Sequence, residues 1–269
     1  MAGKATALLV SVVNLAEAEA AFQGGAEIID VKNPVEGPLG APRPDVVAAI
    51  CRDLRERRPV SVALGEFPGR PCAAALAAVG AALFQPDFLK VGFVGGTGAE
   101  EVTTVLQEIR EGLTCAGFSP LPVVAVAYAD TLHMSAWTLT EFAALAQAGR
   151  AAGCLVDTQE KNGVSLTAVL SCREIAAFID ACRHRGLFCG VAGSLQLADI
   201  AVLQNLGPDI IGVRSAACGG DRLKGRVTAE RVRALKGLFT AGVDSAVAER
   251  FPGCDRWSLV RSAAQGDDR

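Results

Sequence analysis

The sequence is poor in histidine and lacks the cysteine spacing of metal sites and disulfide frameworks. His133 and His184 are the only histidines, and neither has a partner at metal-ligand spacing. The nine cysteines are odd in number, lie scattered, and include no Cys-x-x-Cys pair, which argues against a zinc ribbon or a disulfide-built fold. Ser-His-Asp and Cys-His catalytic sets also find no support. We therefore expect reduced cysteines, a cytoplasmic protein, and no metal.

Basic runs and long apolar segments are missing as well. The net charge is −3 and no cluster of lysine and arginine stands out, so we expect no nucleic-acid partner. Charged or polar residues interrupt every apolar run before it reaches membrane-spanning length, and the beginning of the chain does not resemble a signal peptide. We therefore expect no membrane partner. A hydrophobic share of 51% in 269 residues is enough for a sizeable core.

What the sequence does contain is a regular alternation of short apolar runs and helix-like segments. The runs are apolar throughout, which is typical of parallel strands covered on both faces. About eight strand–helix units predict a TIM (β/α)8 barrel, an α/β fold. The expected strands are 5–13, 26–32, 59–64, 87–93, 121–128, 153–157, 187–192 and 209–214, and the expected helices include 45–57, 71–84, 166–185 and 228–239.

Helix starts and domain limits follow from local signals. Asn14 with Glu17, Thr97 with Glu100, and Thr138 with Glu141 each have the spacing of a capping box at a helix N-terminus. A doubly wound sheet is the rival fold, but it usually carries a glycine fingerprint after its first strand, and none is present here. No linker precedes residue 240, so we expect a barrel over 1–239 and a C-terminal extension over 240–269.

Charged residues at the ends of the even-numbered strands are the candidates for catalysis. Asp30 and Lys32 share one face of the second strand, because side chains alternate along a strand. Lys90 lies on the fourth strand, Asp157 ends the sixth, and Lys161 follows it. Alternate strands of such a barrel contribute to the same interior layer, so these five side chains are expected to meet at one mouth. A structural ion pair and solvated strand-end lysines are the alternatives.

Crowded and partly buried lysines have lowered pKa values, because both neighbouring cations and loss of water disfavour the charged form. A neutral amine is the nucleophile that forms a Schiff base with a carbonyl. The aspartates would keep the remaining lysines charged and move protons. The set therefore indicates carbonyl chemistry such as aldol addition and dehydration. Glu66, Tyr128 and Asp130 also lie near strand ends, where a pocket role and a structural role both remain open.

A second cluster has the residues of a phosphate site. Gly193 and Ser194 follow the seventh strand, and Gly212, Arg214 and Ser215 lie at the end of the eighth. The loops after these two strands are a recurrent phosphate site in TIM barrels, where an arginine would add a charged donor. Ordinary turn glycines and a surface arginine are the alternative interpretation.

Several motifs resemble the (5-formylfuran-3-yl)methyl phosphate synthase family of methanofuran and methylofuran biosynthesis. The similarity extends over about residues 6–238, and its most specific parts are the Asp-Val-Lys-Asn-Pro block and the Asp-x-x-x-Lys-x-Gly block. The motifs are Leu-Leu-Val-Ser at 8–11, Gly-Ala-Glu-Ile-Ile-Asp-Val-Lys-Asn-Pro at 25–34, Glu-Gly-Pro-Leu-Gly at 36–40, Leu-Lys-Val-Gly at 89–92, Asp-Thr-Gln-Glu-Lys-Asn-Gly at 157–163, Ala-Gly-Ser-Leu at 192–195 and Ile-Gly-Val-Arg at 211–214.

The resemblance implies a TIM-barrel lyase that condenses two glyceraldehyde 3-phosphate molecules. The implied product is 4-(hydroxymethyl)-2-furancarboxaldehyde phosphate, formed with loss of one phosphate and two waters and without a cofactor. Lys32 would form the Schiff base, Lys90 would accept a proton, and Asp30, Asp157 and Lys161 would complete the pocket. The alanine-rich composition and the polar segment after 240 differ from the archaeal pattern and are expected of a bacterial, methylotroph-type member.

Other functions remain as alternatives at this point. The chain fits another Schiff-base aldolase on a sugar phosphate, a phosphosugar isomerase without a covalent step, or an inactive barrel that binds phosphorylated metabolites. In each case the partner is a small phosphorylated molecule. Because many barrels of this size self-associate, we also expect a homo-oligomer.

Overall fold

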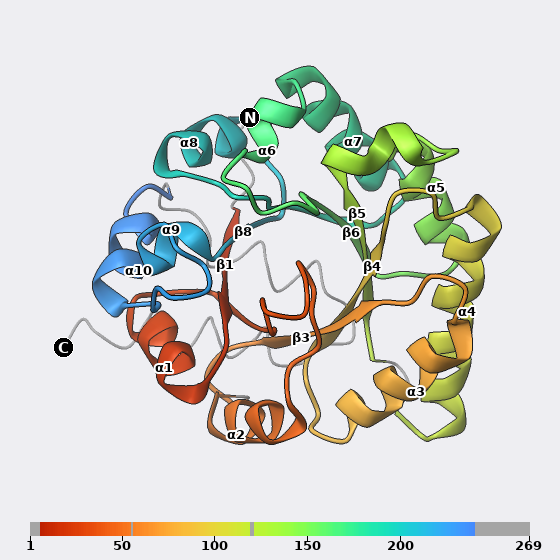
Figure 1. Cartoon of the computed structure of the whole chain (residues 1–269), viewed down its shortest axis with the longest axis horizontal. Coiled ribbons are helices and arrows are strands. Elements are labelled where there is room, and N and C mark those ends of the chain that lie inside the picture. The colour runs from red at the N-terminus through yellow and green to blue at the C-terminus, as the bar shows by residue number, and fades with distance from the viewer. Residues whose placement is uncertain (1–5, 55, 119–120, 240–269) are drawn as a thin grey trace.

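The computed structural model describes residues 6–54, 56–118 and 121–239, and these form a closed barrel of eight parallel strands. Each strand pairs with the next in sequence, and β8 pairs with β1 to close the barrel (Figure 1). The predicted TIM barrel is therefore confirmed. The strands are β1 (Ala7–Val12), β2 (Ile28–Val31), β3 (Val60–Glu66), β4 (Phe88–Phe93), β5 (Val123–Tyr128), β6 (Gly153–Asp157), β7 (Phe188–Val191) and β8 (Ile210–Val213).

The helices form a ring around the barrel (Figure 1). No helix in the described ranges is both long enough and apolar enough to cross a membrane. The helices are α1 (Leu15–Gln23), α2 (Pro44–Leu54), α3 (Pro71–Ala82), α4 (Ala99–Cys115), the 3-10 helix η1 (Ala129–Met134), α5 (Leu139–Ala148), α6 (Leu166–Val169), α7 (Cys172–His184), α8 (Leu197–Leu206), α9 (Ser215–Cys218) and α10 (Ala229–Lys236).

The strands are apolar throughout because each one serves two separate cores. Along β5, Val123, Ala125 and Ala127 belong to the large core between strands and helices. The intervening Val124, Val126 and Tyr128 belong to the smaller core inside the barrel. This alternation follows from the two-residue period of a strand. It also means that a polar side chain on the inner face has to be satisfied within the barrel.

Two of the helix starts expected from sequence differ in the structure. The capping box expected at Thr97 is wrong: α4 begins after Gly98, and the Thr97 hydroxyl donates to the Val94 carbonyl at 2.7 Å. The long helix expected over 166–185 is also wrong. It is divided into α6 and α7, and Ser171 starts α7 with a capping box that includes Glu174. The capping box of Thr138 and Glu141 is confirmed.

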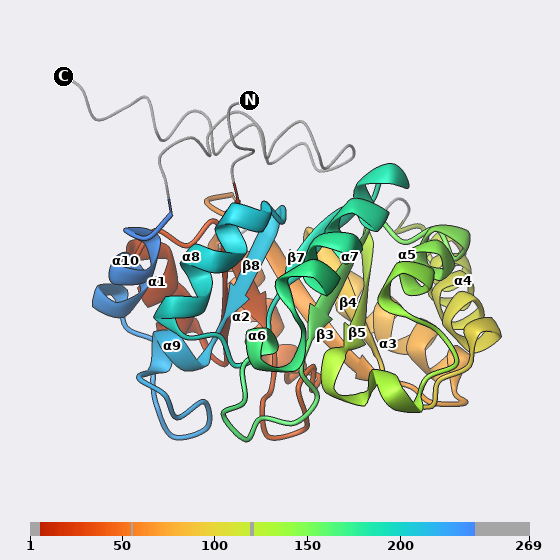
Figure 2. The same ribbon diagram turned by 90° about the horizontal axis from the view of Figure 1, so that it is seen from above.

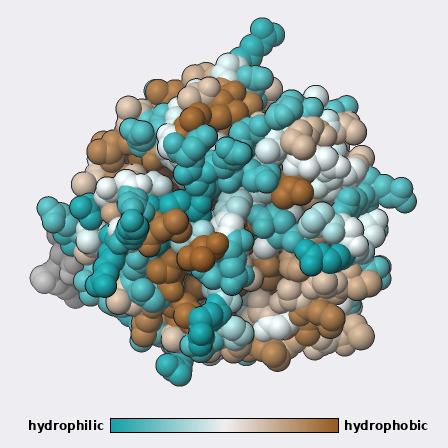
Figure 3. Space-filling view, viewed as in Figure 1, coloured by the Kyte–Doolittle hydropathy of each residue, from teal (hydrophilic) through white to brown (hydrophobic). Residues whose placement is uncertain are grey.

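Three loops stand out from the same end of the barrel (Figure 2). They follow β2, β6 and β8, and they include residues 32–43, 158–165 and 219–228. The C-terminal ends of the strands lie at this end of the barrel. Figure 3 shows this face, where apolar side chains are interspersed among polar ones. Val35, Val164 and Leu223 are large exposed apolar residues of these loops. The C-terminal extension expected at 240–269 lies outside the described residues.

Candidate active site

The deepest charged group at the barrel mouth is a buried pair of Asp30 and Lys90. The Lys90 ammonium lies 2.6 Å from Asp30 Oδ1, and both side chains are almost fully buried. The hydroxyls of Ser11 and Ser61 donate to the same carboxylate at 2.8 and 2.6 Å. Burial opposes the charge on Asp30, but the ammonium groups of Lys90 and Lys32 outweigh it and hold the pKa of Asp30 below its usual value.

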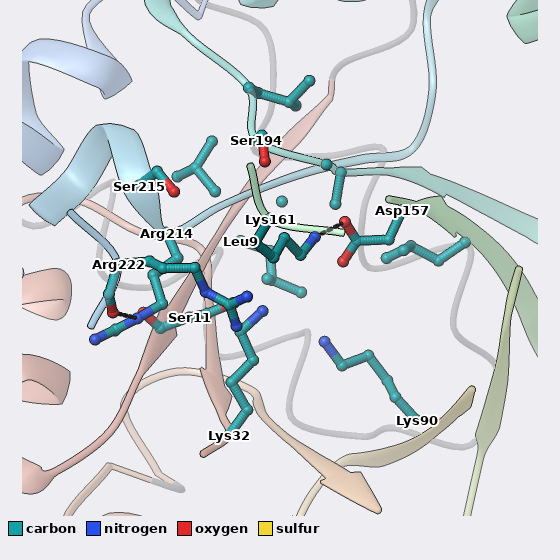
Figure 4. A pocket seen from close by; sticks show the side chains of 16 residues that line it. Leu9, Ser11, Lys32, Lys90, Asp157, Lys161, Ser194, Arg214, Ser215 and Arg222 are labelled. Carbon is teal, nitrogen blue, oxygen red and sulfur yellow. Dashed lines mark hydrogen bonds and ion pairs between the residues drawn. The ribbon is translucent and has the colours of Figure 1, made fainter. Parts of the chain in front are cut away.

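A second pair, Asp157 with Lys161, lies on the opposite side of the mouth. Asp157 ends β6, and the Lys161 ammonium lies 2.5 Å from its Oδ1 (Figure 4). Burial disfavours the charged carboxylate, yet Lys161 and Lys32 together lower the pKa of Asp157. Asp130 fixes the loop that carries Lys161, because its carboxylate accepts the backbone N–H groups of Gln159 and Glu160 at 2.7 and 2.8 Å. Asp130 therefore has a structural role in positioning this lysine.

Lys32 is close enough to both pairs to interact with their charges, and its surroundings differ from those of the other two lysines. It follows β2, it is buried, and its ammonium donates to the Pro38 carbonyl at 3.2 Å. Within the described chain, it has no carboxylate at ion-pair distance. Burial lowers the pKa of Lys32 to about 7; Lys161 and Lys90 also lower it, whereas Asp157 and Asp30 raise it. Loss of water is thus a larger cause than the crowding of cations.

The predicted catalytic and phosphate-binding residues converge on one pocket, with one exception. Lys90 on β4, Lys32 just after β2 and Lys161 in the loop after β6 all line it (Figure 4). Asp30 does not line the pocket and contacts it through Lys90. The other predicted residues that line the pocket are Asp157, Gly193, Ser194, Gly212, Arg214 and Ser215.

The Arg214 guanidinium already donates hydrogen bonds to three acceptors within the protein. Its Nη1 donates to Glu17 of α1 at 2.9 Å and to the Ser11 carbonyl at 3.0 Å, and its Nε donates to the Arg222 carbonyl at 2.9 Å. Both Arg214 and Glu17 are buried. Asn14 accepts the Glu17 backbone N–H as expected of a helix cap, but the Glu17 carboxylate turns to Arg214 and to the Val13 backbone N–H. Arg214 therefore links three segments of the barrel.

Three contributors were missed by the sequence reasoning: Ser11, Ser61 and Arg222. Ser11 and Ser61 pair in register with Asp30 on the two neighbouring strands, so a register argument would have found them. Arg222 lines the pocket from the loop after α9. Its place in an irregular loop gives no periodic signal, and the sequence alone could not have distinguished it from a surface arginine.

Glu66 and Tyr128 form a hydrogen-bonded pair at the edge of the mouth. Burial raises the pKa of Tyr128 well above its usual value, and the neighbouring Glu66 carboxylate acts in the same direction. Gly92 makes room for this pair, because a Cβ at residue 92 would lie 2.6 Å from Tyr128 Oη, 2.9 Å from Glu66 Cγ and 3.1 Å from Leu39 Cδ1. The absent side chain at this position thus leaves the space that this pair occupies.

Gly92→Ala is expected to destabilise the fold by about 1–3 kcal/mol, since close-packed neighbours have to move to admit a methyl group. Thermal unfolding measures the loss. Gly80→Ala is the matched control: a Cβ there meets nothing within 4 Å, and in helix α3 the same change should stabilise by about 0.5–1 kcal/mol. Equal melting temperatures for the two variants would contradict this account of the packing around Gly92.

Comparison with known proteins assigns the chain to a family. The sequence model of the 4-HFC-P synthase family matches residues 8–236. The chain belongs to the 4-HFC-P synthase family. It is 39% identical over 235 residues to the (5-formylfuran-3-yl)methyl phosphate synthase of Methanocaldococcus jannaschii, covering 86% of this chain and 98% of that one. It is 40% identical to the protein of the same name from Methanopyrus kandleri, covering 85% and 96%. The resemblance and the enzyme class predicted from the motifs are confirmed.

Solved structures are similar to this 4-HFC-P synthase family member in fold alone. The thiamine phosphate pyrophosphorylase of Pyrococcus furiosus has a TM-score of 0.56 and 15% identity, covering 88% of this chain and 96% of that one. The phosphoribosyl anthranilate isomerase of Thermus thermophilus has a TM-score of 0.55 and 17% identity, covering 87% of this chain and 98% of that one.

No group of three or more His, Cys, Asp or Glu side chains within the described ranges is arranged to hold a metal ion.

Proposed function

We propose that this family member condenses two molecules of glyceraldehyde 3-phosphate into 4-(hydroxymethyl)-2-furancarboxaldehyde phosphate through a Schiff base on Lys32. The observation that carries the assignment of Lys32 is its ionic surroundings. Lys90 and Lys161 each have a carboxylate within 2.6 Å, whereas Lys32 has none at ion-pair distance within the described ranges. Lys32 is buried with a carbonyl partner and a pKa of about 7, so its neutral form is populated near neutral pH.

The overall reaction balances without an oxidant or a reductant. Two triose phosphates yield one furan phosphate, one inorganic phosphate and two waters. The neutral amine of Lys32 attacks the aldehyde carbon, and loss of water from the adduct gives the imine. Lys90 first passes a proton to Asp30, which lies 2.6 Å away, and the resulting neutral amine accepts the proton released next to the imine carbon. Asp157 and Lys161, on the facing side, donate and remove protons during the dehydration steps.

Borohydride reduction in the presence of glyceraldehyde 3-phosphate tests the covalent step. We expect a stable adduct on the peptide that contains Lys32, identified by mass spectrometry, and a product that absorbs in the near ultraviolet as a furan does. An adduct with an open-chain product would instead indicate another Schiff-base aldolase. Turnover of the triose phosphate without any adduct would indicate an isomerase, and binding without turnover would indicate an inactive barrel.

The metabolic role follows from this product. We propose that the furan phosphate serves methanofuran-type or methylofuran-type cofactor biosynthesis, as in the resemblance given by the motifs. A cytoplasmic location, a homo-oligomeric state and the absence of any cofactor stay predictions. So does phosphate binding by Gly193, Ser194, Gly212, Arg214 and Ser215, for which the pocket supplies two hydroxyls and backbone groups at a position usual for such barrels.

The rate of Schiff-base formation is expected to rise with pH through about 7. The amine reacts only when neutral, and burial brings the pKa of Lys32 to about 7, so the reactive fraction increases about tenfold per pH unit below that value. The unfolded chain would titrate this lysine near 10.4. Between these two values the unfolded state binds the extra proton, so this group makes folding more favourable as the pH rises.

Single-turnover trapping between pH 5.5 and 8.5 measures this titration. The control is Lys224→Met, a change at an exposed lysine of the loop after β8, which should keep the same pH profile. A trapping rate that is flat from pH 5.5 to 8.5, or that falls as the pH rises, would contradict the assignment of a titrating nucleophile.

A further inference from the structure

The cations that line the pocket divide into paired and unpaired groups. Lys90, Lys161 and Arg214 each have a carboxylate within 2.9 Å, supplied by Asp30, Asp157 and Glu17 in turn. The positive charge of these three residues is therefore already balanced within the protein. Two pocket-lining cations, Lys32 and Arg222, have no such partner in the described ranges. Lys32 is used by the covalent step, which leaves Arg222 to be explained.

Arg222 is held in place but keeps most of its hydrogen-bonding capacity. Its Nη2 donates to the Gly37 carbonyl at 3.3 Å, across the mouth from the loop after β2. Its own carbonyl accepts from Arg214 Nε at 2.9 Å, so the backbone is fixed as well. The guanidinium has five N–H donors in a planar fork, and in the described structure one of its nitrogens has a hydrogen-bond partner. The remaining donors are available to a ligand.

The pocket around Lys32 is small. Its cavity volume is about 30 Å³, room for about two water molecules. A second, open cavity of about 710 Å³ adjoins it, which is in the usual range for small-molecule sites. Lys161, Ser194, Ser215 and Arg222 line both. The two spaces therefore meet at a wall of hydroxyl and cationic groups.

We propose that the outer cavity binds the phosphate of the second triose phosphate, and that Arg222 is the cation that holds it. This rests on the proposed condensation, in which one triose is bonded to Lys32 while the other approaches from the mouth. A phosphate dianion is recognised best by a bidentate arginine fork, and the hydroxyls of Ser194 and Ser215 lie on the same wall. Arg214, bonded to Glu17, positions the Arg222 backbone and does not itself bind this phosphate.

The assignment separates the two half-reactions. Imine formation on Lys32 needs one triose phosphate, whereas furan formation needs both. Arg222→Gln should therefore leave borohydride trapping at Lys32 within about twofold of the unmodified protein. The concentration of glyceraldehyde 3-phosphate that half-saturates furan formation should rise about 10–100-fold, the loss expected for charge-assisted hydrogen bonds. Arg222→Lys should recover part of this loss, because it keeps the charge without the fork.

Arg226→Gln is the matched control, an exposed arginine of the same loop, and it should change neither measurement. A parallel fall in trapping and furan formation for Arg222→Gln, or no change in either, would overturn the proposal. If the unmodified protein gave neither adduct nor furan, the proposed condensation would fail by itself. Calorimetry with inorganic phosphate then decides the role of Arg222: binding that weakens at least about tenfold in Arg222→Gln supports it, and unchanged or absent binding overturns it.

Discussion

Lys32→Met should lower furan formation by at least roughly 10³-fold, the scale of loss seen when a covalent nucleophile is removed. Methionine keeps most of the length and volume of the side chain but has no amine to attack the aldehyde. The adduct on the Lys32 peptide should vanish at the same time. The measurements are the near-ultraviolet absorbance of the product and mass spectrometry after borohydride reduction.

Folding should not account for this loss. The Lys32 amine is buried with one carbonyl partner, and its lowered pKa shows that the protein holds the charged form at a cost. An apolar replacement removes that cost, so the melting temperature of Lys32→Met should be equal to or above that of the unmodified protein. Lys224→Met should retain full activity. An adduct that persists in Lys32→Met and maps to Lys161 would reassign the nucleophile and contradict the proposed roles.

The strand order and the convergence of the lysines could be predicted because they depend on local periodicity. Each strand is a short apolar run between helix-like segments, and a closed barrel brings all strand ends to one rim. The position of Lys90 beside Asp30 follows from the inward-facing register of β2, β3 and β4. A two-residue period and an element count were enough to place these groups in one site.

Features that depend on distant partners could not be predicted. Glu17 has the spacing of a helix capping residue, yet its carboxylate pairs with Arg214, which is 197 positions away. The same partner balances the charge of Arg214 within the protein, which the sequence could not show. Thr97 is a different case, because its partner is local: its hydroxyl donates to the Val94 carbonyl, a hydrogen bond that competes with helix capping. Arg222 acquires its place only when the loops after β2 and β8 meet.

Asp30→Asn should be the most destabilising single change at the site, at about 3–5 kcal/mol, because it leaves a buried ammonium without its counterion. Lys90 is 3% exposed, and Asp30 is its only carboxylate at ion-pair distance in the described chain. The amide oxygen can still accept from one of the two serine hydroxyls, and the amide NH2 can donate to the other, so the loss reports mainly on charge. Denaturant unfolding measures it. Furan formation should fall by about 10²–10⁴-fold, the usual scale for proton transfer by a positioned group.

A double variant separates these two effects. Asp30→Asn combined with Lys90→Met removes both charges, and the replacement of a buried ion pair by neutral groups is often neutral or stabilising. Stability should therefore recover to within about 1 kcal/mol of the unmodified protein, as a coupling between contacting residues. Activity should stay lost, because no proton acceptor remains beside the imine carbon. If the double variant regained activity along with stability, the pair would be a structural ion pair alone, and Lys90 would have no part in the proton transfer.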